Sequence, residues 1–298
     1  MASYEFVTVD VFTETRFGGN PLAVFPDAAG LTDAQMQAIA REFNLSETTF
    51  VLPPDNPMHH AKVRIFTPAT ELPFAGHPNV GTGYVLGTRD PDPPEHYTFE
   101  EKAGLVRVHV LRNADKTITG ARVAAPVPLS LGAEVPVGII AACAGLRDED
   151  VVTTGHNPVV ASVGTEFVIA ELTNIAALGR SSPDIGAFRS AAAAVPGMQL
   201  RFALHLYCRT KNGLRARMFA PLGGVLEDPA TGSANAALAA LLTHLDPGAD
   251  ISRHYHIEQG VEMGRPSVIL AGGRKTGGSV TATVAGGCVP VIRGTLTM

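Results

Sequence analysis

The chain has 298 residues, of which 45% are hydrophobic and 17% are charged, and its formal net charge is −5. This length suffices for one large domain or two ordinary ones with buried cores. The acidic balance and the lack of a Lys/Arg-rich block argue against a nucleic-acid partner. No apolar run approaches the roughly 18 residues that cross a bilayer, so no membrane partner is expected either.

The first ten residues predict a strand that starts the fold. They lack the basic and apolar regions of a secretion signal. Cys143, Cys208 and Cys288 are far apart and odd in number, which predicts neither a disulfide framework nor a cysteine metal site. We therefore expect a cytoplasmic protein with reduced thiols.

A helix is predicted over residues 32–42, capped by Thr32 and with Met36, Ile39 and Ala40 on one face. A polar cluster that contains Glu47 follows, and an apolar strand over 48–52 comes next. A general base for C–H abstraction must be a partly desolvated carboxylate near the substrate. Glu47 fits this description, and the alternative is a solvated loop residue.

An internal repeat organises the chain. The runs KVRIFTP at 62–68 and LRARMFAP at 214–221 share an arginine, a phenylalanine and a proline in the same order, about half a chain apart. A Gly-containing turn and an apolar helix follow each run, and each is preceded by an apolar strand and a helix. The matching segments are helices 32–42 and 184–194, apolar runs 48–52 and 202–208, and helices 77–87 and 231–244.

The repeat predicts an α+β protein with two equivalent β-rich lobes related by a pseudo-two-fold axis. Each lobe wraps one central helix, and the Pro/Gly-rich segment 125–138 is the candidate connection. We expect an N-terminal lobe of residues 1–124, joined by the last strand at 286–298. Residues 125–285 form the C-terminal lobe.

The two turns before the central helices predict an anion pocket. They read AGHPNVGTG at 75–83 and EDPATGSANAA at 227–237. Free N–H groups and the dipole at a helix start favour anions, and glycine lets the backbone approach a ligand. His77 and Asp228 are read as equivalent residues of these turns. The alternative is ordinary capping by Thr231 or Ser233.

The carboxylate of Glu47 has no counterpart in the second half. The segment near 197–201, which follows the second helix of the repeat, carries none. A symmetric racemase would place one base on each face of its substrate. A single carboxylate instead indicates one-base chemistry, in which the same Glu takes a proton and returns it elsewhere.

Five runs together resemble the phenazine-biosynthesis PhzF-like family of the diaminopimelate-epimerase-like superfamily. They are FGGNPLAVF at 17–25, NLSETTFV at 44–51, RIFTPATELPFAGHPNVGT at 64–82, RMFAPLGGVLEDPATGSANAAL at 217–238 and QGVEMGRPS at 259–267. The resemblance implies two lobes, each a β-barrel-like sheet around a central helix, with the active site between them. It is also consistent with a homodimer.

The resemblance also implies roles for individual residues. Glu47 corresponds to the catalytic acid/base, and His77, Asp228 and Ser233 to the surrounding polar shell. The residues implied in substrate binding are Asn20, Gly76, His77, Gly232 and Ser233. The characterised family reaction is a proton shift on a dihydro-hydroxyanthranilate without a cofactor. Cysteine-using epimerases of the superfamily carry a Cys in each matched turn, and this chain does not.

We therefore expect a cofactor-independent isomerase that acts on a small amino or carboxylic acid. An amino-acid epimerase or racemase is one alternative, and a non-catalytic small-acid-binding protein of the same fold is another. A catalytic metal is not expected, because the adjacent His59 and His60 would point to opposite faces of a strand. No P-loop, dinucleotide GxGxxG or serine-hydrolase GxSxG motif is present.

Overall fold

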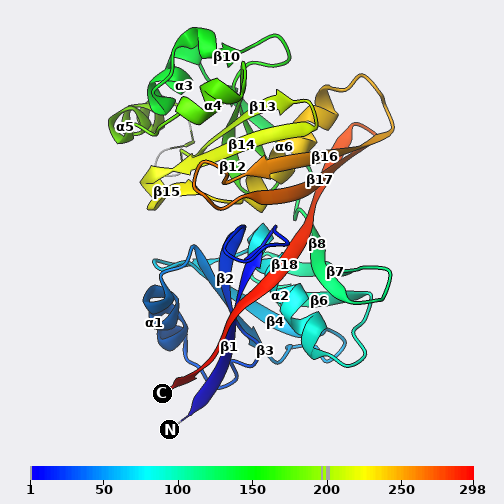
Figure 1. Cartoon of the computed structure of the whole chain (residues 1–298). Helices are drawn as coiled ribbons and strands as arrows, with labels where there is room; N and C mark the ends of the chain where they lie inside the picture. The colour runs from blue at the N-terminus through cyan, green and yellow to red at the C-terminus, as the bar shows by residue number, and fades with distance from the viewer. Residues whose placement is uncertain (1, 196, 199–201) are drawn as a thin grey trace. The chain divides into compact units, whose positions relative to one another are not determined.

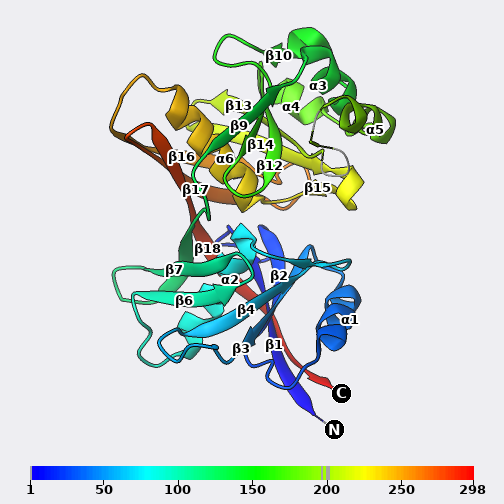
Figure 2. The ribbon, with the colours of Figure 1, turned by 180° about the vertical axis from the view of Figure 1, so that it is seen from behind.

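The computed structural model describes residues 2–195, 197–198 and 202–298. They fall into two units: Met1–Pro126 with Val284–Met298, and Val127–Thr283. Both units contain a mainly antiparallel sheet and helices (Figures 1 and 2), so the α+β prediction is confirmed. Each unit is considered by itself below.

The first unit is a closed sheet of eight strands around one helix. Its strands pair in the circular order β18–β1–β2–β3–β4–β6–β7–β8–β18. Its elements are β1 (Ser3–Val11), β2 (Asn20–Phe25), α1 (Asp33–Phe43), β3 (Glu47–Leu52), β4 (Ala61–Phe66), β5 (Glu71–Leu72), α2 (Gly76–Arg89), β6 (His96–Glu101), β7 (Gly104–Arg112), β8 (Ile118–Ala124) and part of β18 (Ser279–Thr297). Figure 1 shows β1 and β18 running side by side.

Helix α2 is the core of this barrel. It contacts β1, β2, β3, β7 and β8, and most of its residues are buried. Its glycines permit this close packing: a Cβ on Gly81 would lie 2.5 Å from Leu22, and one on Gly83 would lie 2.5 Å from Val108. A helix buried on all sides has little room for side chains where the strands approach it. The small residues of the GTG run therefore position α2 inside the sheet.

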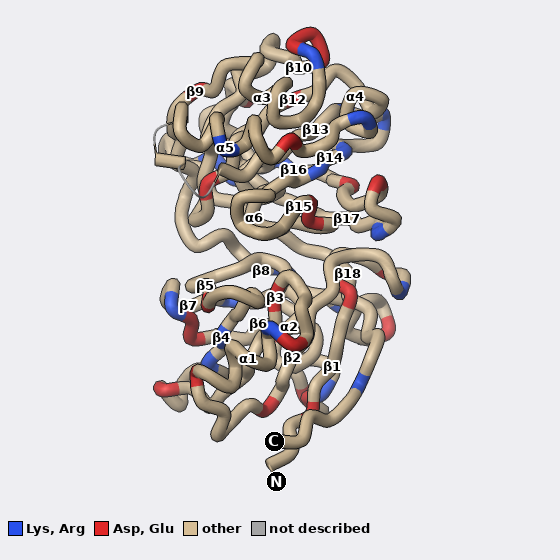
Figure 3. The backbone as a smooth tube through the Cα atoms, turned by 90° about the vertical axis from the view of Figure 1, so that its left-hand side faces the viewer, with Lys and Arg blue, Asp and Glu red and all other residues tan. Residues whose placement is uncertain are grey.

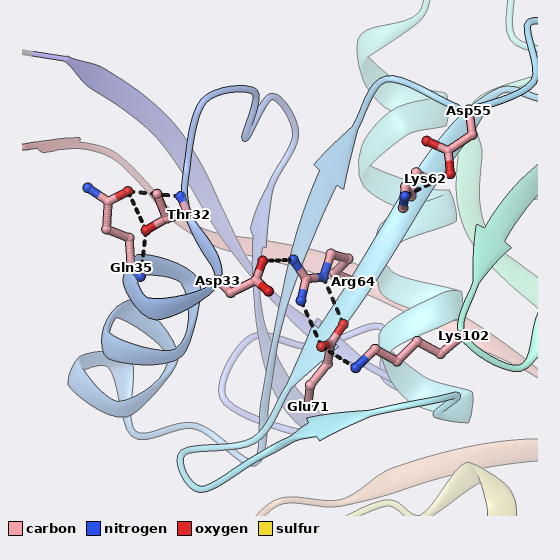
Figure 4. Close-up of polar contacts among 8 residues, drawn as sticks. All are labelled: Thr32, Asp33, Gln35, Asp55, Lys62, Arg64, Glu71 and Lys102. Carbon is pink, nitrogen blue, oxygen red and sulfur yellow. Dashed lines mark hydrogen bonds and ion pairs between the residues drawn. The ribbon is translucent and has the colours of Figure 1, made fainter.

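Helix α1 lies on the outside of the barrel and begins as predicted. Thr32 is its N-cap, and Thr32 and Gln35 form a reciprocal capping box (Figure 4). The residues of α1 that are buried against the sheet are Met36, Ile39 and Ala40. They pack with phenylalanines of β2, β3 and β4. The predicted capping and apolar face are confirmed.

The second unit contains a sheet in the order β9–β11–β12–β13–β14–β16–β17, with β12–β13 and β14–β16 parallel. Its elements are β9 (Ser130–Glu134), α3 (Val137–Ala144), η1 (Asp148–Asp150), β10 (Val151–Val152), β11 (Val159–Ser162), β12 (Glu166–Leu172), α4 (Ile175–Arg180), α5 (Ile185–Ala194), β13 (Leu204–Thr210), β14 (Gly213–Ala220), η3 (Pro221–Gly223), β15 (Val225–Asp228), α6 (Gly232–Leu245), β16 (Ile251–Gln259) and β17 (Ser267–Thr276). Helix α6 contacts β11, β12, β16 and β17. A separate apolar cluster joins α3, α4 and α5 to β12 and β13.

The same pairing pattern occurs in both units. Strands β2 and β3 are parallel in the first unit, as β12 and β13 are in the second, and the parallel pair β4–β6 has its equivalent in β14–β16. Helices α2 and α6 both have 14 residues and start with glycine. In each helix an asparagine, Asn79 or Asn235, bonds the carbonyl of the N-cap residue. The sequence repeat therefore corresponds to a repeat of local structure.

Charged residues of both signs are interspersed along the backbone of each unit (Figure 3). Within the described ranges, no helix is both long and apolar enough to cross a membrane.

Candidate active site

Glu47 begins β3 directly after helix α1. Asn44 adopts a left-handed backbone conformation, with φ of 50°, that ends the helix, and asparagine tolerates this conformation. Strand β3 then runs parallel to β2, with Leu22 opposite Glu47. The Ser46 hydroxyl donates to Asn20 Oδ1 over 2.9 Å at the start of β2. The parallel pairing thus brings the predicted residues Asn20 and Glu47 to the same end of two neighbouring strands.

His77 lies beside Glu47. Its Nε2 is 3.5 Å from Glu47 Oε2, and the side chains are only 6% and 16% exposed. Burial lowers the pKa of His77 to about 3, so the imidazole is neutral at neutral pH. A neutral imidazole does not lower the pKa of a neighbouring carboxylate as a cation would. The pair is therefore suited to proton abstraction by Glu47.

The start of α2 has no side-chain cap within the described residues. Its N-cap position is Ala75, which has no side-chain acceptor. Gly76 and His77 are the first two helical residues, and Asn79 Nδ2 donates to the Ala75 carbonyl over 3.0 Å. An uncapped helix start carries N–H groups and a positive dipole end that favour an anion. The candidate base thus adjoins a candidate carboxylate-binding turn.

The start of α6 is built around Asp228. Thr231 occupies the N-cap position, but its hydroxyl donates to Asp228 Oδ2 over 2.5 Å and makes no cap bond. Gly232 and Ser233 are the first two helical residues. The alternative that Thr231 or Ser233 caps this helix is therefore wrong. Asp228 instead uses one carboxylate oxygen to fix the turn before the helix.

Gln259, the last residue of β16, holds this turn together and was not singled out from the sequence. It is fully buried. Its Nε2 donates to the Asp228 carbonyl and to Thr231 Oγ1, and its Oε1 accepts from the Thr231 N–H and from Asn235 Nδ2, over 2.7–3.2 Å. The run QGVEMGRPS contains this residue, but its role depends on a pairing between β14 and β16 that a linear motif does not reveal.

The structural repeat does not make His77 and Asp228 equivalent, contrary to the expectation from the sequence. Since both helices begin with glycine, the second helical residue is His77 in α2 and Ser233 in α6. The strand pairings align Asp228, opposite Met218, with Leu72, opposite Ile65. The equivalence of His77 with Asp228 is therefore wrong. They were matched because each lies in or beside a turn, whereas the strand register assigns them to different positions of the repeat.

The position equivalent to Glu47 is Ala203. Thr48 pairs with Phe66 in the first unit, as Leu204 pairs with Phe219 in the second, so the residue before Leu204 matches Glu47. Residues 199–201 of the segment proposed from the sequence lie outside the described residues. The counterpart is an alanine, which is consistent with one-base chemistry.

The remaining reactive groups of the described chain lie elsewhere. Cys143, Cys208 and Cys288 are free and buried, and none belongs to either turn. In the described ranges, no three His, Cys, Asp or Glu side chains gather as a metal site would require. Two surface cavities of the first unit adjoin Arg89, in the last turn of α2, and are lined by none of the candidate residues.

Comparison with known proteins decides the family. A family model described as phenazine biosynthesis-like protein, PhzC-PhzF, matches residues 9–294. The chain belongs to this PhzF family. A trans-2,3-dihydro-3-hydroxyanthranilate isomerase of Pseudomonas chlororaphis is 36% identical over 99% of this chain and 100% of its own. An uncharacterized isomerase of Mesorhizobium japonicum is 40% identical over 99% of both chains.

Solved structures agree with the PhzF assignment. A PhzF-family protein of Bacillus anthracis is 25% identical, covers 100% of both chains and has a TM-score of 0.89. A probable proline racemase of Agrobacterium radiobacter, 12% identical with a TM-score of 0.66 over 99% of this chain and 93% of its own, shares the fold. The chain is thus an isomerase of the PhzF family.

Proposed function

We propose that this isomerase moves a proton on a small carboxylic or amino acid of the dihydro-hydroxyanthranilate type, without a cofactor, and that Glu47 is its acid/base. The contact between Glu47 and the neutral, buried His77 carries the proposal. The relatives named as trans-2,3-dihydro-3-hydroxyanthranilate isomerases support the substrate class.

In the proposed reaction Glu47 first acts as a base. Its carboxylate takes a proton from an sp³ carbon, and the electron pair of the broken C–H bond delocalises into the adjoining unsaturated system. The protonated Glu47 then returns the proton to a different carbon of the same system, so the atoms balance and no redox partner is needed. His77 orients the carboxylate without neutralising it.

The polar residues of the helix starts bind the substrate in this proposal. The N–H groups at each helix start, of Gly76 and His77 in α2 and of Gly232 and Ser233 in α6, are the proposed substrate-binding groups, because uncapped helix starts favour anions. Asp228, which accepts a hydrogen bond from the Thr231 hydroxyl, and Ser233 complete the polar residues of the second turn in this proposal. Asn20 keeps the Glu47 loop in place through Ser46.

Deuterium incorporation tests the proposal. Trans-2,3-dihydro-3-hydroxyanthranilate and a panel of carboxylic and amino acids are incubated in deuterated water and followed by mass spectrometry. We expect wild type to isomerise or exchange at least one acid. Glu47→Gln should lower the rate by a factor of about 10² to 10⁴, the range that general acid–base groups contribute. Glu42→Gln, which alters an exposed Glu of α1, is the matched control.

The outcomes separate the alternatives. Transfer of substrate deuterium directly into product would support a single returning base strongly. Inversion at Cα with one solvent deuterium would identify an epimerase instead. A binding protein would show analogue affinity that Glu47→Gln leaves unchanged, and no exchange with any acid. Full activity in Glu47→Gln would refute the assigned acid/base.

Two further expectations belong to this proposal. The three buried free cysteines support a reducing, cytoplasmic location. A homodimer is expected as well, which the mass of the purified protein in solution would test.

A further inference from the structure

Glu101, the last residue of β6, is half-buried, and the proposed reaction does not use its carboxyl group. Tyr97, Phe99 and Glu101 alternate along one face of β6, and Tyr97 and Phe99 are 5% and 0% exposed. Both Glu101 carboxyl oxygens are inaccessible to solvent, and no hydrogen bond of good geometry reaches them from the described residues. A carboxyl in this environment resists ionisation.

Asn79 of α2 is the polar neighbour of Glu101. Its side chain lies close enough to lower the pKa of the carboxyl, but burial has the larger effect and raises that pKa to about 8. Asn79 Nδ2 donates to the Ala75 carbonyl, while its Oδ1 is buried and has no hydrogen-bond partner in the described chain. A carboxylic acid O–H of Glu101 that donates to Oδ1 would satisfy both side chains.

The repeat shows what occupies the same place in the second unit. Lys62 of β4 and Arg215 of β14 each lie two residues before the arginine of the repeated motif. Each pairs in parallel with a residue of the next long strand, β6 or β16. The partner is Glu100 in the first unit and Glu258 in the second. The next residue is therefore Glu101 in one unit and Gln259 in the other. Gln259 bonds Asn235, as Glu101 faces Asn79.

We propose that Glu101 is a positioning residue for the first turn of α2. Its neutral carboxylic acid holds Asn79 by a hydrogen bond, as the Gln259 amide holds Asn235. Through Asn79 and the Ala75 carbonyl it fixes the backbone of Gly76 and His77. The proposal rests on the proposed function in one respect: that turn binds the substrate's carboxylate. An ionised Glu101 would place a negative charge near this turn and weaken the binding of the substrate's carboxylate.

Within the described residues, no ion pair reaches Glu101. Lys102, the next residue, binds Glu71, which also binds Arg64 (Figure 4). Neutral His77 is the titratable residue of the nearest turn of α2. The other charged or titratable side chains on α2 and on the strands that pair with β6 are Tyr84 and Arg89 of α2, Lys62 of β4, and Arg107, His109 and Arg112 of β7. Of these, Lys62 is paired with Asp55, Arg89 with Glu5, and Arg112 bonds two backbone carbonyls.

The first test measures protonation directly and needs no activity. The protein is labelled with ¹³C at the glutamate carboxyl carbons, and its NMR spectrum is recorded from pH 4 to 10. We expect one resonance, absent from Glu101→Gln, to titrate with a midpoint near 8. The same resonance should persist in Glu95→Gln, an exposed control. A midpoint near 4.5 for the Glu101 carboxyl would overturn the proposal.

The second test separates positioning from mere structure. In wild type, KM for the substrate should rise as the pH passes about 8 while kcat stays nearly constant. Glu101→Leu leaves Asn79 unsatisfied and should raise KM about tenfold at pH 7. Glu101→Gln should restore the wild-type KM at pH 7 and abolish its rise with pH.

Failure of this inference and failure of the proposed function look different. If Glu101→Gln resembles Glu101→Leu, or if KM of Glu101→Gln still rises above pH 8, the positioning role is refuted while isomerase activity stands. If no acid is turned over, the proposed function fails, and the carboxyl titration still decides the protonation of Glu101.

Discussion

Arg64 and Arg217 occupy equivalent positions in the two units and share two kinds of contact. Each guanidinium lies over the phenylalanine two residues later, at 5.1 and 4.8 Å from the ring centroid. Each also makes a two-pronged ion pair with a glutamate of the following short strand, Glu71 or Glu227. The arginine thus fixes the short strand that leads into the central helix and the turn before it.

Removal of these two arginines should have unequal effects. Arg217 is 7% exposed and also donates to the Leu178 and Ser181 carbonyls, so Arg217→Met takes the ion-pair partner from Glu227, whose side chain is only 15% exposed. We expect a loss of about 3–5 kcal/mol of unfolding free energy. Arg64→Met should cost less, because Glu71 keeps its ion pair with Lys102. Urea unfolding of both variants measures this, and equal losses would contradict the argument.

At the scale of elements, α1 determines where β3 and Glu47 begin. The helix is anchored at one end by the capping box of Thr32 and Gln35 and stopped at the other by left-handed Asn44. Both signals are local, which is why the start of this helix and its buried face could be predicted from the sequence. The equivalent helix of the second unit, α5 (Ile185–Ala194), also begins with a side-chain cap, supplied by Asp184.

The cap of α1 makes a quantitative prediction. Thr32→Ala removes the acceptor for the Gln35 N–H, now 3.3 Å from Thr32 Oγ1, and should lower stability by about 1 kcal/mol. Thr32→Ser keeps the hydroxyl and should stay close to wild type. Thermal unfolding of the two variants provides the comparison, and a serine variant as unstable as the alanine variant would show that the lost methyl, rather than the cap, matters.

Positions fixed by strand register could not be read from the sequence. Local motifs singled out Glu47, His77, Asp228 and the two turns as candidates, but they treated His77 and Asp228 as equivalent and placed the Glu47 counterpart near 197–201. Glu101 resembles an ordinary solvated residue at a strand end. Its burial arises only because β6 faces α2 inside a closed sheet, a long-range arrangement that periodicity does not encode.

On the scale of the whole molecule, buried titratable groups of opposite kinds limit stability on both sides of neutral pH. Burial lowers the pKa of His205 to about 4 and of His77 to about 3, below their usual 6.5. Unfolded chains bind these protons first, so stability falls as the pH drops below 6.5. The raised pKa of Glu101 acts oppositely: its contribution is complete below 4.5 and is lost as the pH rises to about 8.

Stability should therefore be greatest near pH 6.5. His205 is fully buried, and no hydrogen bond of good geometry reaches its two ring nitrogens from the described residues. Burial therefore dominates its pKa, and His205→Gln should flatten the acid side by about 1 kcal/mol per pH unit. Glu101→Gln should flatten the decline toward pH 8. Denaturant unfolding at several pH values tests both, and slopes identical to wild type would show that these groups titrate alike in folded and unfolded chains.

Strand β18 has a consequence for the order in which the protein forms during synthesis. The second unit is one continuous stretch, Val127–Thr283, whereas the first needs residues from Val284 onward to close its barrel. Until the ribosome has made those residues, β1 and β8 each lack the neighbour that β18 provides, and open strand edges invite association with other chains. Synthesis of the unit that carries Glu47 begins before that of the second unit and ends after it. While the second unit is translated, the open edges of β1 and β8 must therefore be kept from pairing with strands of other chains.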